Sequence, residues 1–175
     1  GSGSASLDTN IQDGFSNYII SKNFEKKVFI VEANSIHMNN LKKLYSKNDN
    51  IKIYNLAIIP DNIDLKMMDF FYCLEDFPNY QIFSNSKSFV KKHFPNGNIK
   101  KKSVECLKAS DFFNKNNIKK IDHLSIDIEG MDYFVLINLD LKKFKIKNIS
   151  FEHLHLSFWQ KIKIVHKLMI NGYFF

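Results

Sequence analysis

Residues 124–136 read LSIDIEGMDYFVL, a run of β-favouring residues that gives way to a glycine and then to helical spacing. This pattern predicts a strand over 121–128 and a helix over 131–139. Asp127 and Glu129 are two positions apart, so they face the same side of the strand end. Gly130 permits a sharp turn after them. We therefore expect a pair of carboxylates at the end of a buried strand, as a candidate site.

The same alternation of strand and helix continues on both sides of this stretch. Strands are predicted over 27–33, 51–59 and 146–153, helices over 37–45 and 157–171, and the start of one more strand over 172–175. Strands that alternate with helices favour a parallel sheet covered on both faces. The expected fold class is α/β, a Rossmann-like three-layer sandwich with a mostly parallel, doubly wound sheet. A complete sheet of this kind would need further residues at both ends.

The alternation is interrupted between Pro60 and Lys120, where short strands, aromatic side chains and turns are mixed. We expect this irregular insertion to act as a lid or binding loop. Residues 1–4 have the composition of a tag or linker. Residues 5–175 are therefore predicted to form one domain of ordinary size.

Composition limits the classes of protein that the chain can represent. It has 25 basic and 18 acidic residues, but every basic residue is lysine. Arginine makes the bidentate contacts with phosphate and guanine, so we expect no specific nucleic-acid partner. No run approaches the ~18 apolar residues of a membrane helix and no secretory signal is visible, so we expect a cytoplasmic protein without a membrane span. Cys73 and Cys106 lack the spacing of a zinc site and are predicted to be buried thiols.

A nucleoside site is predicted at the first strand-to-helix turn, which carries Asp8, Asn10, Gly14 and Phe15. Glycine there lets the backbone approach a ligand, and the helix start offers N–H groups. Glu32 ends the next strand, where such folds hydrogen-bond ribose hydroxyls. The glycine fingerprint of NAD and FAD sites and the lysine loop of ATPases are both absent. S-adenosylmethionine is the cofactor that fits this pattern.

Four segments in this order and at these spacings resemble the FkbM-type methyltransferases, a branch of the class I S-adenosylmethionine-dependent enzymes: KVFIVEAN (27–34), IKIYNLAI (51–58), IDHLSIDIEGMDYFVL (121–136) and IKNISFEH (146–153). The resemblance covers about residues 7–175. Its most specific part is IDIEGMDYFVL, close to the family's usual Asp-x-Glu-Gly-x-(Glu/Asp) strand end. The resemblance implies an enzyme that methylates a hydroxyl of a sugar, glycan or related small molecule.

The resemblance also implies that the cofactor contacts residues after three strands: Glu32, Ala33, Asn34, Ser35, Asn55, Leu56, Ala57 and Asp127. Glu32 would hold the ribose diol, and Asn34 with Ser35 would flank the adenosine. Residues 55–57 would line the adenine. Asp127 would face the methionine part of the cofactor or the acceptor.

The first turn departs from the family's usual Asp-x-Gly-Ala-Asn-x-Gly. Here residues 6–14 read SLDTNIQDG, and Asp8 stands in the place of the first glycine if Asn10 is aligned. An acidic side chain there would crowd and repel the cofactor's carboxylate. A catalytically silent binding or scaffold module of the same fold is therefore an alternative.

The catalytic residues are predicted to be Asp127, Glu129, Glu152 and His153. Methyl transfer to a hydroxyl needs an aligned acceptor and a base for its proton. We expect His153 or Asp127 to be the base and Glu129 or Glu152 to orient it. His153 and His155 with Asp127 or Glu152 could instead ligate a divalent ion, so a metal-assisted O-methyltransferase is a second alternative. A histidine that hydrogen-bonds locally is the simpler interpretation, and no metal is predicted.

The aromatic stretch 69–85 is expected to be mostly the core of the insertion. Tyr72, Tyr80 and Ser84 carry polar groups and are the predicted substrate contacts. The last predicted helix has an apolar stripe that is expected to pack against the sheet: Trp159, Ile162, Val165, Leu168 and Met169.

Overall fold

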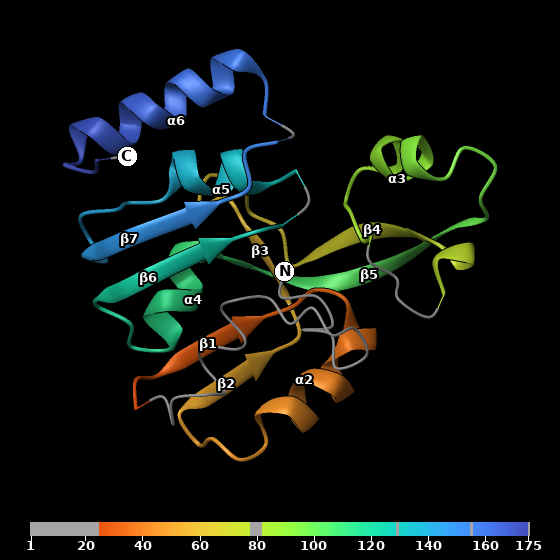
Figure 1. Ribbon diagram of the computed structural model, residues 1–175, viewed down its shortest axis with the longest axis horizontal. Helices are drawn as coiled ribbons and strands as arrows, with labels where there is room; N and C mark the ends of the chain where they lie inside the picture. Colours follow the sequence, from red (N-terminus) through yellow and green to blue (C-terminus); the bar gives the residue numbers. More distant parts are fainter. Residues whose placement is uncertain (1–24, 78–81, 129, 155, 175) are drawn as a thin grey trace. The chain divides into compact units, whose positions relative to one another are not determined.

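The computed structural model describes residues 25–77, 82–128, 130–154 and 156–174 as a mixed α/β fold (Figure 1). The elements along the chain are β1 (Val28–Val31), η1 (Ser35–His37), α2 (Met38–Tyr45), β2 (Ile51–Tyr54), β3 (Ala57–Ile59), β4 (Met67–Cys73), η2 (Leu74–Asp76), α3 (Lys87–His93), β5 (Ile99–Lys108), α4 (Ala109–Lys115), β6 (Ile121–Ile126), α5 (Asp132–Asn138), β7 (Ile146–Phe151) and α6 (Phe158–Ile170). The chain divides into two compact units, the first of residues 1–57 and 69–105 and the second of residues 58–68 and 106–175.

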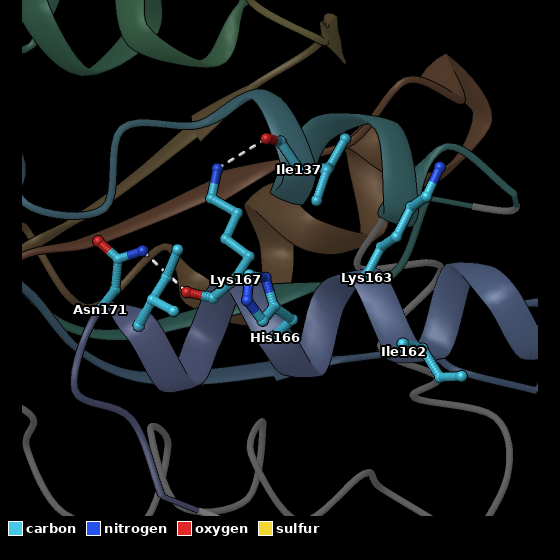
Figure 2. Close-up of a pocket in the computed structure, with 7 residues that line it drawn as sticks. Ile137, Ile162, Lys163, His166, Lys167 and Asn171 are labelled. Atoms are coloured by element: carbon cyan, nitrogen blue, oxygen red, sulfur yellow. Dashed lines mark hydrogen bonds between the residues drawn. The ribbon is translucent and has the colours of Figure 1, made fainter.

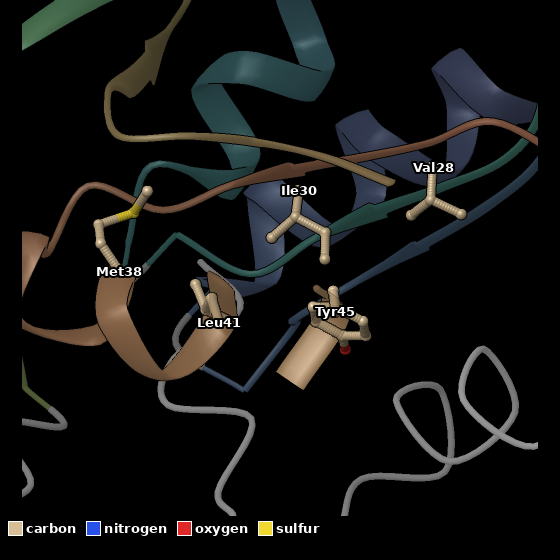
Figure 3. Close-up of a cluster of buried hydrophobic side chains, with 5 residues drawn as sticks. All are labelled: Val28, Ile30, Met38, Leu41 and Tyr45. Carbon is tan, nitrogen blue, oxygen red and sulfur yellow. The ribbon is translucent and has the colours of Figure 1, made fainter. Parts of the chain in front are cut away.

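The first unit contains the parallel pair β1–β2, with Val28 opposite Ile51 and Val31 opposite Tyr54. Burial alternates along β1, so Val28 and Ile30 share one face. They join a buried cluster with Met38, Leu41 and Tyr45 of α2, which recur at the spacing of one helix face (Figure 3). Burying each of these side chains contributes about 1.5–3 kcal/mol, so the cluster fixes α2 against the pair.

The second unit contains the parallel pair β6–β7, with Ile121 opposite Ile146 and Ile126 opposite Phe151. α6 packs against α5 and begins with a capping box, in which Ser157 accepts from the Gln160 amide and the Gln160 side chain accepts from the Ser157 amide. The two parallel pairs and their helices confirm the α/β class. The described strands form three separate sheets, so one doubly wound sheet stays a prediction, as does the single domain.

The strand predicted over 51–59 is two strands. β2 pairs with β1, whereas β3 belongs to a three-stranded sheet in the order β3-β5-β4. Asn55 lies between them, and its side chain donates to the carbonyl oxygens of Glu32 and Ala33. The chain therefore leaves the first sheet at Asn55, which an unbroken run of β-favouring residues does not reveal.

The region 60–120 is more regular than predicted. It holds β4, α3, β5 and α4, and β5 is ten residues long. Exposed lysines at the start of β5 hide its strand pattern in the sequence. Gly97 precedes this strand, and a Cβ there would lie 2.3 Å from the Cys73 sulfur, so only glycine fits without movement.

The predictions for the end of the chain are partly wrong. Residues 172–174 are not a strand, because Gly172 has a φ of +84° and the Tyr173 amide donates to the Leu168 carbonyl, which caps α6. The prediction that the apolar stripe of α6 packs against the sheet is also largely wrong. Leu168 is buried as expected, but the other four stripe residues are exposed: Trp159, Ile162, Val165 and Met169. No helix within the described residues is long and apolar enough to cross a membrane.

Candidate functional site

Glu32 directly follows β1 and is held in place by backbone groups. Its amide donates to the Tyr54 carbonyl, which extends the pairing with β2 by one step. Its side chain is only 5% exposed, and its Oε1 accepts a hydrogen bond of 2.7 Å from the Asn34 amide. The carboxylate is therefore fixed at the carboxyl end of a parallel strand, the edge at which sheets of this class bind ligands.

Asn34 connects this acid to the short helix η1. Its Oδ1 accepts from the Ile36 amide and caps η1, and its Nδ2 lies 3.4 Å from Nε2 of the buried His37. Ser35 is half-buried, and its hydroxyl hydrogen-bonds the Lys102 ammonium group of β5. The sequence analysis did not single out Lys102, because lysines occur throughout the chain.

Asn55 joins the ends of β1 and β2. Its Nδ2 donates to the carbonyl oxygens of Glu32 at 2.8 Å and Ala33 at 3.1 Å. The next two residues along the chain are the half-buried Leu56 and the buried Ala57. The structure thus brings together four predicted cofactor residues within the first unit: Glu32, Ala33, Asn34 and Asn55.

Three predicted catalytic residues lie at the ends of β6 and β7 in the second unit. Asp127 and Glu152 each follow the last partnered residues of the pair, Ile126 and Phe151, and the Glu152 amide donates to the Ile126 carbonyl at 3.2 Å. Asp127 and His153 are exposed, and Glu152 is half-buried. Because the strands are parallel and adjacent, the backbone places these three residues at one sheet edge, as predicted.

Asp132 lies just after the end of β6, and the sequence analysis gave it no role. It is 2% exposed, and its two carboxylate oxygens accept from the amides of Ile128 and Gly130, each at 3.3 Å. Gly130 has a φ of +98°, which favours glycine. Asp132 therefore holds the turn that follows Asp127. Its signal in the sequence is the last acid of the Asp-x-Glu-Gly-x-(Glu/Asp) pattern.

Two of the predicted substrate contacts, Tyr72 and Ser84, lie beside the packed rings of Phe70 and Phe83. The rings of Phe70 and Phe83 stack with centroids 5.0 Å apart, and the half-buried Tyr72 lies 6.1 Å from Phe83. Ser84 is 1% exposed, bridges to Phe71 in antiparallel fashion, and accepts a hydrogen bond from the Ser86 amide. Its hydroxyl therefore supports the local backbone.

Several predicted residues lie outside the described residues: Asp8, Asn10, Gly14, Phe15, Tyr80, Glu129 and His155. Within the part of the chain that is described, no group of three or more His, Cys, Asp or Glu side chains is placed to hold a metal ion.

Both cysteines are buried, as predicted. Burial, together with the hydrogen bond that the thiol donates to Glu75, raises the pKa of Cys73. A thiol with a raised pKa is a poor nucleophile, so we assign Cys73 no part in catalysis.

Comparison with known proteins links these two strand ends to one family. The family described as the methyltransferase FkbM domain matches residues 7–173. This match includes Glu32 after β1, Asp127 after β6, Asp132 at the start of α5 and Glu152 after β7. No curated protein and no solved structure matches the chain.

Proposed function

The chain belongs to the methyltransferase FkbM domain family, and we propose that it transfers a methyl group from S-adenosylmethionine to a hydroxyl oxygen of a sugar, glycan or related small molecule. The observation that carries this proposal is the buried carboxylate of Glu32 at the end of β1. In a parallel α/β fold, an acid in this place suits the two hydroxyl groups of a ribose.

The groups around Glu32 fit a nucleoside. A carboxylate can accept hydrogen bonds at about four positions, and the Asn34 amide donates to Oε1. Hydrogen bonds from ribose hydroxyls to an ionised carboxylate are of the stronger, charge-assisted kind. Because Asn55 ties down the backbone at Glu32 and Ala33, this acceptor needs little reordering on binding. We assign the remaining cofactor contacts to Ser35, Leu56, Ala57, Asp127 and the first turn with Asp8, Asn10, Gly14 and Phe15.

The proposed chemistry divides between the cofactor and the residues after β6 and β7. When bound, S-adenosylmethionine would supply the methyl group of its sulfonium: the carbon–sulfur bond would break as the acceptor oxygen bonds to that carbon, and S-adenosylhomocysteine would leave. Asp127 or His153 takes the proton of the acceptor hydroxyl, whose oxygen forms the new bond to carbon. Glu152 or Glu129 orients the base. Asp132 acts through the backbone, because it holds the turn after Asp127.

Acceptor recognition is assigned to the aromatic region 69–85. Aromatic rings pack against the apolar faces of sugars, and a tyrosine hydroxyl can hydrogen-bond their polar edges. Tyr72 and Tyr80 are the proposed contacts, and the Ser84 hydroxyl supports the local backbone by accepting from the Ser86 amide.

Calorimetric titration of the folded protein with S-adenosylmethionine tests the proposal. We expect binding heat, and transfer of a labelled methyl group to a hydroxyl-bearing saccharide in a panel of acceptors. Absence of heat from well-folded protein would overturn the proposal in favour of the silent binding module. Activity that a chelator abolishes would instead support the metal-assisted alternative. Label that reaches amines but no hydroxyl would overturn the acceptor class alone.

A further inference from the structure

α6 has two different apolar faces. Ile164 and Leu168 are buried, with Ile164 0% exposed, on the side that packs against α5. Six further apolar side chains of the same helix are exposed: Phe158, Trp159, Ile162, Val165, Met169 and Ile170. Trp159 is 69% and Met169 62% exposed, and the rings of Phe158 and Trp159 lie edge to face with centroids 5.6 Å apart. We call this second face the outward face of α6, and exposed apolar side chains gathered on one side of a helix are typical of an interaction site.

Lysines border the outward face. At about 100° per residue, Phe158, Ile162, Val165 and Met169 lie on one side of the helix, with Trp159 and Ile170 next to them. On the same geometry Lys161 falls at one edge of this arc and Lys163 at the other. Both lysines are exposed, and α6 contains no acidic residue. The outward face is therefore mostly apolar, with the exposed His166 between Ile162 and Trp159, and it has a lysine at each edge.

A hollow of about 560 Å³ lies beside this face, between α5 and α6 (Figure 2). Ile137, Ile162 and Ile170 supply apolar lining, and Lys163 and His166 supply polar groups. Lys167 also lines the hollow, but its ammonium group donates to the Ile137 and Leu139 carbonyls, each at 2.7 Å. Burial lowers the pKa of Lys167, and its two hydrogen bonds cap the C-terminal end of α5. Lys161 and Lys163 are left as the outward cations of α6.

We infer that the outward face of α6 docks the protein on an anionic phospholipid surface. Aromatic and aliphatic side chains on one helix face, flanked by lysines, are the arrangement that lies in a membrane interface, with the apolar groups at the acyl boundary. The lysine stems reach along that boundary and place their charges at the phosphates. Charge complementarity selects this partner, because the chain carries a net charge of +7. A second copy would bring the cationic edges of two such helices together, which is unfavourable.

The chain provides its own probe for this inference, because Trp159 is its one tryptophan. We expect the Trp159 emission to shift to shorter wavelength with vesicles of equal parts phosphatidylcholine and phosphatidylserine. Vesicles of phosphatidylcholine alone should cause little shift, and added salt should reverse it. No shift with the anionic vesicles, or an equal shift with both kinds, overturns the inference. A shift that follows protein concentration without lipid, with a dimer in analytical ultracentrifugation, also overturns it.

Three double variants locate the surface. Lys161→Gln with Lys163→Gln should weaken vesicle binding by about tenfold or more, since each lysine near an anionic surface contributes several-fold. Lys91→Gln with Lys92→Gln removes the same charge from exposed positions on α3 and should bind nearly as the unchanged protein does. Ile162→Gln with Met169→Gln should also weaken binding while the circular dichroism of the fold is kept, because both side chains are exposed. Equal losses in the α3 and α6 lysine variants would overturn the assignment to α6.

Discussion

The two strand ends that carry candidate site residues, one in each unit, use acidic residues in different ways. After β1, Glu32 is buried and receives the Asn34 amide. After β6, Asp127 is exposed, and the buried acid is Asp132, which receives the amides of Ile128 and Gly130. Each end therefore has one buried acid tied to backbone amides, but only the end of β6 adds an exposed acid. A fixed carboxylate suits ligand binding, whereas an accessible one suits proton transfer.

The largest expected effect is a loss of turnover on changing the exposed residues after β6 and β7. If Asp127 is the base, Asp127→Asn should lower turnover by about 10²-fold or more, and if His153 is the base, His153→Ala should do so. Positioned proton transfer contributes about this much. Affinity for S-adenosylmethionine should fall much less than turnover does, as measured by calorimetry beside the initial methyl-transfer rate. Asp111→Asn, an exposed acid on α4, is the matched control. If both variants kept full turnover, the end of β6 and β7 would not supply the base.

Changing the buried Glu32 after β1 should mainly affect binding of the cofactor. Glu32→Gln should weaken S-adenosylmethionine binding by about 10- to 100-fold, because hydrogen bonds to a charged group contribute about 1.5–3 kcal/mol. Stability should change little, since the amide oxygen can still accept from Asn34. Calorimetry and urea unfolding measure the two effects, with the exposed Glu25→Gln as control. Unchanged affinity would remove Glu32 from the cofactor site.

Substitutions at Asp132 test whether the buried acid after β6 stabilises the fold. Asp132→Ala should lower the free energy of unfolding by about 1–3 kcal/mol, because the amides of Ile128 and Gly130 lose their acceptor. Asp132→Asn keeps one acceptor oxygen and should lose less. Urea denaturation of the two variants gives the comparison. Equal midpoints for Asp132→Ala and the unchanged protein would show that the turn does not depend on this side chain.

The smallest effect is expected at the asparagines that bridge neighbouring strands. Asn55→Ala removes the bonds to Glu32 and Ala33, and Asn148→Ala removes a similar bond of 2.9 Å to the Asp122 carbonyl in the other unit. Each lost bond should cost about 0.5–1.5 kcal/mol in thermal unfolding experiments. Only Asn55→Ala should also weaken cofactor binding. Equal cofactor affinity in the two variants would contradict the support role of Asn55.

Much of the site was predictable because strand ends are local features. Glu32 and Asp127 each follow a run of alternating or continuous apolar residues, and the ends of two paired parallel strands lie at one edge of their sheet. The adjacency of Asp127, Glu152 and His153 followed from this rule alone. The role of Asp132 did not, because only the folded turn places its carboxylate against the amides two and four residues earlier.

The predictions that were wrong, for residues 51–59, for α6 and for residues 172–174, all concern features that depend on contacts between different segments. The run over 51–59 has no local break in its pattern, and the switch between sheets depends on Asn55 reaching residues 32 and 33. On α6, apolar residues lie on both faces, so helical spacing could not decide which face packs. The turn at Gly172 is likewise stabilised by the Tyr173 amide on the end of α6.

The sequence by itself determined the α/β class, the methyltransferase resemblance and the acidic strand ends, because each depends on residue type and spacing along a short segment. The tertiary structure alone decided which acids are buried, where the strand over 51–59 divides and which face of α6 is exposed. These properties arise from hydrogen bonds and packing between segments distant in the chain, and hydrophobic spacing within one segment does not encode them.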